Sequence, residues 1–111
     1  MAFDPTGFSI SISDRDGRAV VVIRGELDLA TAPELEAAIQ ARLDEGQDVV
    51  VDLRELAFMD STGLRVIVSA HARAQDGEQS FVIVRPRPGG PIERILAIAG
   101  VASVLEVVDD A

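Results

Sequence analysis

The sequence contains no cysteine, no lysine, no tryptophan and no tyrosine, and its one histidine is His71. Without cysteine there can be no disulfide scaffold and no thiol catalysis, and a single histidine adds too little to make a zinc finger. Without lysine there can be no catalytic or phosphate-binding lysine. We therefore expect neither a cofactor nor a bound metal.

Positive charge is also scarce: ten arginines face 19 acidic residues, which gives a net charge of −9. A phosphate backbone is bound by clustered cations, so we expect no nucleic-acid partner. The longest nearly apolar stretch, residues 95–105, is interrupted by Gly100 and Ser103. It is well short of the roughly 20 residues that a membrane helix needs, so we expect no membrane partner. Residues 1–7 show no signal peptide, which predicts a cytoplasmic protein.

The length predicts one domain. A chain of 111 residues with 48% hydrophobic residues is long enough for one core and too short for two. We expect a single domain over residues 1–111, with its core at about 8–108.

The first elements have the pattern of a hairpin. From Phe8 to Ser13 apolar residues alternate strictly with serines, which is typical of a half-buried strand. Asp16-Gly17 favours a tight turn into a second strand over residues 19–24. The chain therefore opens with an antiparallel pair.

Three helices and further strands follow. Thr31 and Glu34 have the spacing of a capping box, which predicts a helix that ends near Gly46. The β-branched run 49–53 predicts a central strand covered on both faces, as in sheets with crossover helices. The remaining elements are expected as a helix from Asp60 to Gly77, a strand over 81–84, a helix from Pro91 that ends at Gly100, and a short strand within 104–108. This order predicts the α/β class, with a mixed sheet of four to five strands, an N-terminal antiparallel hairpin and crossover helices packed on the sheet.

The most informative segment is the junction before the second helix, where Asp60, Ser61 and Thr62 occur together. With Asp60 as the cap, Ser61 is the first helical residue, and its hydroxyl lies where a helix start favours an anion. A phosphate there would add about 1.5 to 2 negative charges. The plainer interpretation, which the residue types alone favour, is that these side chains only cap a helix.

The apolar residues just before this junction, Leu56, Phe58 and Met59, also allow two interpretations. They either lie at the edge of the core or offer apolar contact to a partner. Core packing is the simpler expectation.

Catalytic interpretations find little support. Asp52 lies near the end of the central strand, as the acceptor of a phosphoaspartate receiver does, but a receiver also uses a lysine and this chain has none. His71 is ten residues from Ser61 on the same helix, about 15 Å away by helical rise, so the two cannot form a hydrolase pair. We expect no catalytic residue, and expect His71 at the border of its helix.

Three motifs together resemble one family. Gly25-Glu26-Leu27-Asp28, Val50-Val51-Asp52-Leu53 and above all Phe58-Met59-Asp60-Ser61-Thr62-Gly63-Leu64 are similar to STAS domains, specifically those of bacterial anti-sigma factor antagonists. The resemblance extends from about Phe8 to Val108.

The resemblance implies a STAS-type fold and a switch. In this family the unphosphorylated antagonist binds an anti-sigma factor that is also a serine kinase, and so releases a sigma factor. Phosphorylation blocks the binding, and a protein serine phosphatase restores it. The antagonist itself catalyses nothing.

Carried over to this chain, the resemblance makes Ser61 the phosphorylated residue and Thr62 a secondary candidate. It implies a partner-binding surface made of Asp28, Asp60, Ser61, Thr62 and Gly63. Two alternatives stay open: a STAS scaffold or accessory subunit that does not dissociate, in a stress-signalling assembly or a lipid-transport complex, and a STAS domain that binds a small ligand.

Overall fold

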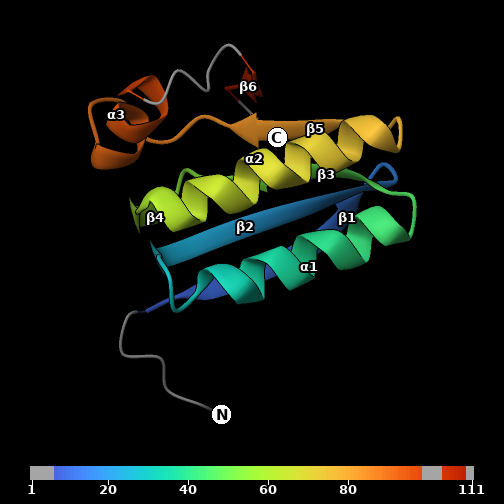
Figure 1. Cartoon of the computed structure of the whole chain (residues 1–111), viewed down its shortest axis with the longest axis horizontal. Coiled ribbons are helices and arrows are strands. Elements are labelled where there is room, and N and C mark those ends of the chain that lie inside the picture. The colour runs from blue at the N-terminus through green and yellow to red at the C-terminus, as the bar shows by residue number, and fades with distance from the viewer. Residues whose placement is uncertain (1–6, 99–103, 110–111) are drawn as a thin grey trace.

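The computed structural model describes residues 7–98 and 104–109, which form one six-stranded sheet and three helices (Figure 1). The strands are β1 (Ser9–Arg15), β2 (Arg18–Leu27), β3 (Asp48–Asp52), β4 (Leu56–Met59), β5 (Phe81–Val84) and β6 (Glu106–Val108). The helices are α1 (Ala32–Asp44), α2 (Ser61–Asp76) and α3 (Pro91–Ile98). The predicted α/β class is confirmed.

The sheet is mixed, in the order β1-β2-β3-β5-β6. Only β1 runs antiparallel to its neighbour, whereas β3, β5 and β6 continue the sheet in parallel. The predicted hairpin is present, and its turn has positive φ at Asp16 (53°) and Gly17 (81°), as a tight hairpin turn requires. Because the other strands are parallel, their carboxyl ends lie at one edge of the sheet.

The sixth strand, β4, is one more than the four to five that the sequence predicts. The ten residues of β2 reach two partners in turn: the first part pairs with β3 and the end pairs with β4. The register shifts between Gly25 and Glu26. Gly25 has φ 89°, and a Cβ there would lie 2.7 Å from the backbone of Gly7, so only glycine fits. A four-residue strand without alternation leaves too weak a pattern to detect.

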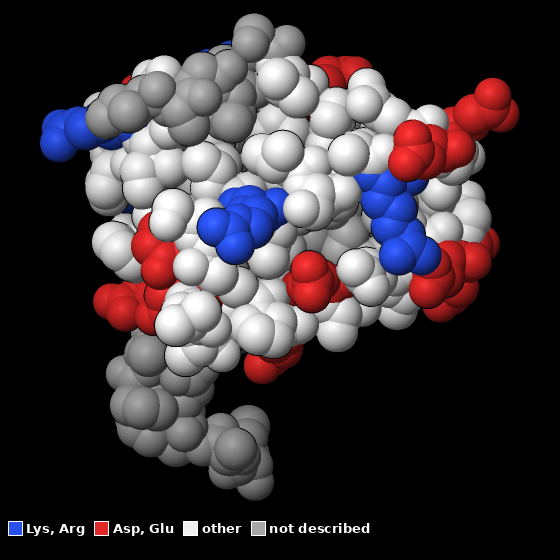
Figure 2. Space-filling view, in the orientation of Figure 1, with Lys and Arg blue, Asp and Glu red and all other residues white. Residues whose placement is uncertain are grey.

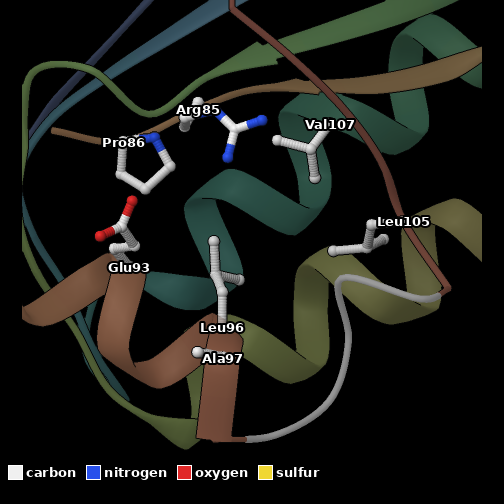
Figure 3. Close-up of a pocket in the computed structure, with 7 residues that line it drawn as sticks. All are labelled: Arg85, Pro86, Glu93, Leu96, Ala97, Leu105 and Val107. Carbon is white, nitrogen blue, oxygen red and sulfur yellow. The ribbon is translucent and has the colours of Figure 1, made fainter. Parts of the chain in front are cut away.

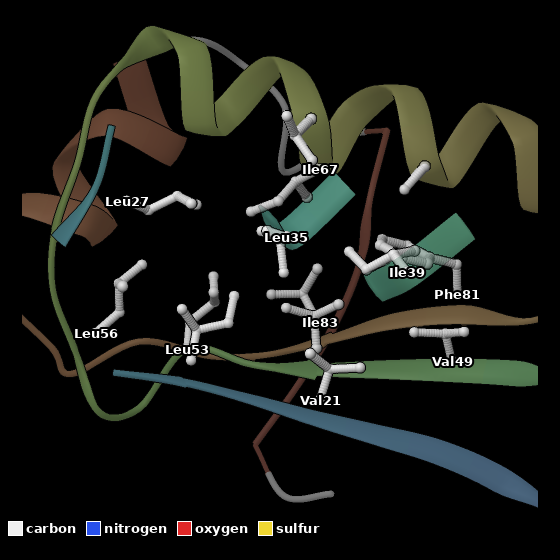
Figure 4. Close-up of a cluster of buried hydrophobic side chains, with 14 of the residues drawn as sticks. Val21, Leu27, Leu35, Ile39, Val49, Leu53, Leu56, Ile67, Phe81 and Ile83 are labelled. Carbon is white, nitrogen blue, oxygen red and sulfur yellow. The ribbon is translucent and has the colours of Figure 1, made fainter. Parts of the chain in front are cut away.

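The main core lies between the sheet and the helices α1 and α2, which cover one face (Figure 1). Figure 4 shows Leu35 and Ile39 of α1 and Ile67 of α2 gathered with strand side chains such as Val21 and Ile83. Both helices thus present an apolar face to the sheet.

The opposite face of the sheet carries a second, smaller cluster. Val20, Val50 and Val84 are buried there, and the described members of this cluster come from strands alone. All the described helices contribute their buried side chains to the main core instead. The prediction that β3 is buried on both sides is confirmed, but the expected helical cover exists on one face only.

The capping box predicted for α1 is wrong. Thr31 occupies the N-cap position but makes no side-chain hydrogen bond to the helix start. Its hydroxyl donates instead to the carbonyl of Glu26 (2.8 Å) and accepts the N–H of Asp28 (2.9 Å). The threonine stabilises the turn before the helix, because a hydroxyl can bond either to the turn behind it or to the helix ahead.

The C-terminal elements agree with the prediction where the structure describes them. The third helix begins at Pro91 as expected, and the last strand lies within the predicted range. The predicted helix end at Gly100 lies outside the described residues. None of the described helices combines the length and the apolar character needed to cross a membrane.

Candidate functional site

The predicted site lies where β2 and β4 end and α2 begins. Leu27 and Met59 are register partners in the parallel pair β2 and β4, and the N–H of Asp60 donates to the carbonyl of Leu27 at 3.1 Å. The next residues of the two strands, Asp28 and Asp60, therefore leave the sheet side by side. The structure thus brings together two acidic residues that are 32 positions apart in the sequence.

Asp60 caps α2. Its Oδ1 accepts the N–H groups of Thr62 (2.9 Å) and Gly63 (3.0 Å), so the predicted cap and the predicted helix start at Ser61 are both confirmed. One carboxylate oxygen satisfies two backbone donors that would otherwise lack an intrahelical partner. The cap holds the first turn of the helix in place.

Ser61 and Thr62 differ in accessibility. Ser61, the first residue of α2, is exposed, whereas Thr62 is half-buried. An enzyme that modifies a hydroxyl must reach it, so the geometry favours Ser61 over Thr62 as an acceptor.

Gly63 belongs to the predicted site, but it is buried beneath the surface. A Cβ built on it would lie 2.7 Å from Cγ of Leu27 and 3.0 Å from Cγ of Met59. Real Cβ atoms do not approach so closely, so glycine here allows α2 to pack directly on the ends of β2 and β4. Its contribution to any binding surface is to position the neighbouring residues.

Asp28 has a structural task as well. Its Oδ1 accepts the N–H groups of Ala30 (3.0 Å) and Thr31 (3.2 Å), an arrangement typical of an aspartate that stabilises a turn. The side chain is half-buried. Asp28 therefore shapes the loop between β2 and α1, which forms one side of the site.

Two exposed apolar residues belong to the chain segments that lead into the site. Leu29 is 74% exposed in the turn after β2, and Phe58 is 42% exposed in β4. Core packing is confirmed for Leu56 and Met59 but is wrong for Phe58. Leu29 was not predicted from the sequence, although a leucine two residues beyond Leu27, past the end of a strand, could have indicated an exposed apolar residue. Exposed apolar residues beside polar ones are typical of protein-binding surfaces.

A shallow groove of about 200 Å³ runs between the first halves of α1 and α2. It is lined by Leu29, Ala32, Pro33, Glu36, Thr62, Arg65, Val66 and Ser69. The groove begins next to Ser61, so a partner that contacts Ser61 can extend into it.

The charges around Ser61 are mostly negative. Asp28 and Asp60 come from the strand ends and Glu36 from α1, whereas Arg65 is the arginine in the first half of α2. In Figure 2 one blue side chain over α2 is surrounded by white, and another, further along the helix, lies among red ones. Arg73, in the second half of α2, forms an ion pair with Asp44.

The receiver interpretation of Asp52 is not supported by its contacts. The carboxylate is buried and forms an ion pair with Arg54 at 2.7 Å. Burial raises the pKa of Asp52, but hydrogen bonds from the Arg54 side chain and backbone, together with the charges of Arg54 and Arg24, outweigh it, and the pKa lies below its ordinary value. The group is an anchored anion rather than a free nucleophile.

His71 is buried rather than placed at the helix border. It is 8% exposed and packs edge-on against Phe81 with ring centroids 6.1 Å apart, and neither ring nitrogen has a hydrogen-bond partner among the described residues. It lies inside the core and does not belong to the site.

A second hollow, of about 370 Å³, lies between α3, the end of β5 and β6 (Figure 3). Its two charged side chains are already engaged: Arg85 pairs with Asp109 at 2.9 Å, and Glu93 accepts the N–H of Gly89 at 2.8 Å. The rest of the lining is Pro86, Leu96, Ala97, Leu105 and Val107. Among the described lining residues, the hollow therefore offers a ligand mainly apolar contact. The described residues contain no group of three side chains suited to a metal ion.

Comparison with known proteins gives a consistent result. A family model described as "Mlab, STAS domain" matches residues 10–108. The anti-sigma-B factor antagonist of Listeria monocytogenes is 31% identical over 101 residues, which are 89% of this chain and 87% of the relative.

Two solved structures extend the comparison to three dimensions. The crystal structure of an anti-sigma factor antagonist from Mycobacterium paratuberculosis matches with a TM-score of 0.85 at 28% identity, over 96% of this chain and 90% of the other. The phosphorylated form of SpoIIAA, a Bacillus cell fate determinant, matches with a TM-score of 0.68 at 18% identity, over 92% of this chain and 91% of the other. At that identity the second likeness shows the fold alone.

Proposed function

Because the chain belongs to the STAS domain family, we propose that it is an anti-sigma factor antagonist whose binding is switched by phosphorylation of Ser61. In its unphosphorylated form it binds an anti-sigma factor with serine kinase activity and so frees a sigma factor. Phosphorylation ends the binding, and a protein serine phosphatase restores it. The chain acts in the cytoplasm and catalyses no step itself.

One observation carries this proposal: Ser61 is exposed at the first position of α2, held there by the Asp60 cap and the packing of Gly63 on Leu27. An accessible hydroxyl suits a kinase, and Leu29, an exposed apolar residue of the adjoining groove, suits a partner. The anti-sigma factor antagonists among the relatives and solved structures agree with it.

Electrostatics explains how the switch would work. A typical interface buries about 800 Å² on each partner, and the surface around Ser61 is already acidic. A phosphate adds about 1.5 to 2 further negative charges at its centre. A partner suited to the unphosphorylated surface then has to desolvate a dianion that it does not pair, and the complex separates.

The test is a phosphorylation assay. The full chain is incubated with lysate of its source cells and ATP, and intact mass and phosphopeptide mapping then count and locate the phosphates. We expect one phosphate on Ser61, its loss in Ser61→Ala, and its retention in Thr62→Ala. No phosphate, or a phosphate elsewhere, would contradict the switch and favour the alternative of a STAS subunit that stays bound to its partners.

A further inference from the structure

Among the described residues, Arg65 differs from Arg73 on the same helix in having no acidic partner. It is exposed on α2, and it makes no ion pair with any described residue, whereas Arg73 on the same helix pairs with Asp44. Glu36 lines the same groove as Arg65 but forms no ion pair with it. The guanidinium is therefore available to a new anion.

The position of Arg65 directs it toward Ser61. The two residues are four apart on α2, and side chains at this spacing lie on the same helix face with Cβ atoms about 5–6 Å apart. Helical side chains also lean toward the N-terminus of their helix, which brings the longer side chain back over the shorter one. Arg65 lines its groove together with Thr62, in the first turn of α2, and Leu29, in the turn after β2. This agrees with a side chain that leans toward the N-terminus of α2.

We propose that Arg65 is the intramolecular ligand of the phosphate on Ser61: once the serine is modified, its guanidinium closes over the phosphate on the face of α2. This inference rests on the proposed function, because it needs a phosphate at that position. An acidic group four residues before a basic one is the favourable order in a helix, and arginine is well suited to hold a phosphate through paired N–H donors.

The consequence reaches beyond one contact. Near Ser61, Asp28 and Asp60 lie at the strand ends, and Glu36 lines the groove together with Arg65. Phosphorylation adds a dianion at Ser61. When Arg65 binds that phosphate, its positive charge is no longer available to a partner. Phosphorylation would thus change the charge of the groove as well as that of Ser61.

The test uses the full chain with phosphoserine installed at position 61 during translation, so that no kinase is needed. The apparent pKa of the phosphate is measured by phosphorus NMR titration in the parent, in Arg65→Gln and in Arg73→Gln. The acidic groups Asp28, Asp60 and Glu36 are present in all three proteins, so a difference in pKa isolates one arginine.

We expect Arg65→Gln to raise the pKa of the phosphate by about half a unit, because a nearby cation favours the dianion. Arg73→Gln should leave it unchanged, and Arg65→Lys should restore part of the shift. The same pKa in Arg65→Gln as in the parent would overturn the role of Arg65. Because the phosphate is installed, failure of the kinase assay would refute the proposed function and leave this measurement valid.

Discussion

Leu27, the last residue of β2, packs directly against Gly63 in the first turn of α2. A Cβ on Gly63 would lie only 2.7 Å from Cγ of Leu27, and the adjacent Asp60 N–H donates to the carbonyl of Leu27 at 3.1 Å. Together these contacts fix the start of α2, and with it the orientation of the Ser61 side chain, to the end of a core strand.

Gly63→Ala should destabilise the chain. Helix propensity alone favours alanine over glycine by about 1 kcal/mol, whereas overpacking of a buried site costs about 1–3 kcal/mol. Because Leu27 is fully buried and cannot easily move aside, we expect a net loss of up to about 2 kcal/mol in the free energy of unfolding, measured with urea. The matched control is Gly90→Ala, whose Cβ would lie 3.4 Å from the nearest described atom and which should change little. A more stable Gly63→Ala protein would show that the helix start can shift.

The cap of α2 can be tested separately. Asp60→Ala leaves the N–H groups of Thr62 and Gly63 without their acceptor, and we expect the free energy of unfolding to fall by about 1 kcal/mol. Asp60→Asn keeps an oxygen in the same place and should lose much less. Equal losses in the two variants would mean that charge rather than capping determines the contribution of Asp60.

His71 offers a gain in stability. Both of its ring nitrogens are buried and have no hydrogen-bond partner in the part of the chain that the structure describes, and an unsatisfied buried polar group costs about 1–3 kcal/mol. His71→Leu removes these atoms and keeps an apolar side chain against Phe81. We expect the free energy of unfolding to rise by about 1 kcal/mol and the melting temperature with it, whereas His71→Asn should lower both. A loss in His71→Leu would indicate that the ring contact outweighs the unpaired nitrogens.

Ionisation of Asp52 should make the free energy of unfolding depend on pH. Its pKa in the folded chain lies below the ordinary value of 3.8, so the folded state favours the ionised form. The stability that this contributes is present above about pH 4 and is lost as the pH falls through the lower, folded-state pKa. Urea unfolding between about pH 7 and pH 2 should show a gap between the parent and Asp52→Asn that is constant near neutrality and closes in acid. A gap that persists unchanged at the acidic end would contradict the ion pair with Arg54.

The features that follow a local pattern could be predicted from the sequence. The Asp16-Gly17 turn and the Asp60 cap each depend on neighbouring residues, and the structure confirms them. The acceptor role of Ser61 stays a prediction, although its exposure is now visible.

The features that depend on distant residues could not be predicted. The strand β4 exists because β2 extends beyond β3 and offers a free edge. Gly63 is buried because Leu27, 36 positions earlier, ends directly beneath it. The hydroxyl of Thr31 donates to the carbonyl of Glu26 rather than capping α1, because the turn after β2 brings that carbonyl within its reach.

The central claim, a phosphorylation switch at Ser61, is tested most directly by affinity. Isothermal titration calorimetry suits a chain without tryptophan or tyrosine. The ligand is a purified anti-sigma factor with a kinase domain from the same source, titrated without ATP into the unmodified chain, the chain carrying phosphoserine at position 61, and Ser61→Ala. We expect Ser61→Ala to bind as tightly as the unmodified chain and the phosphorylated chain to bind at least about tenfold more weakly. Equal affinities of the phosphorylated and unmodified chains would contradict the switch.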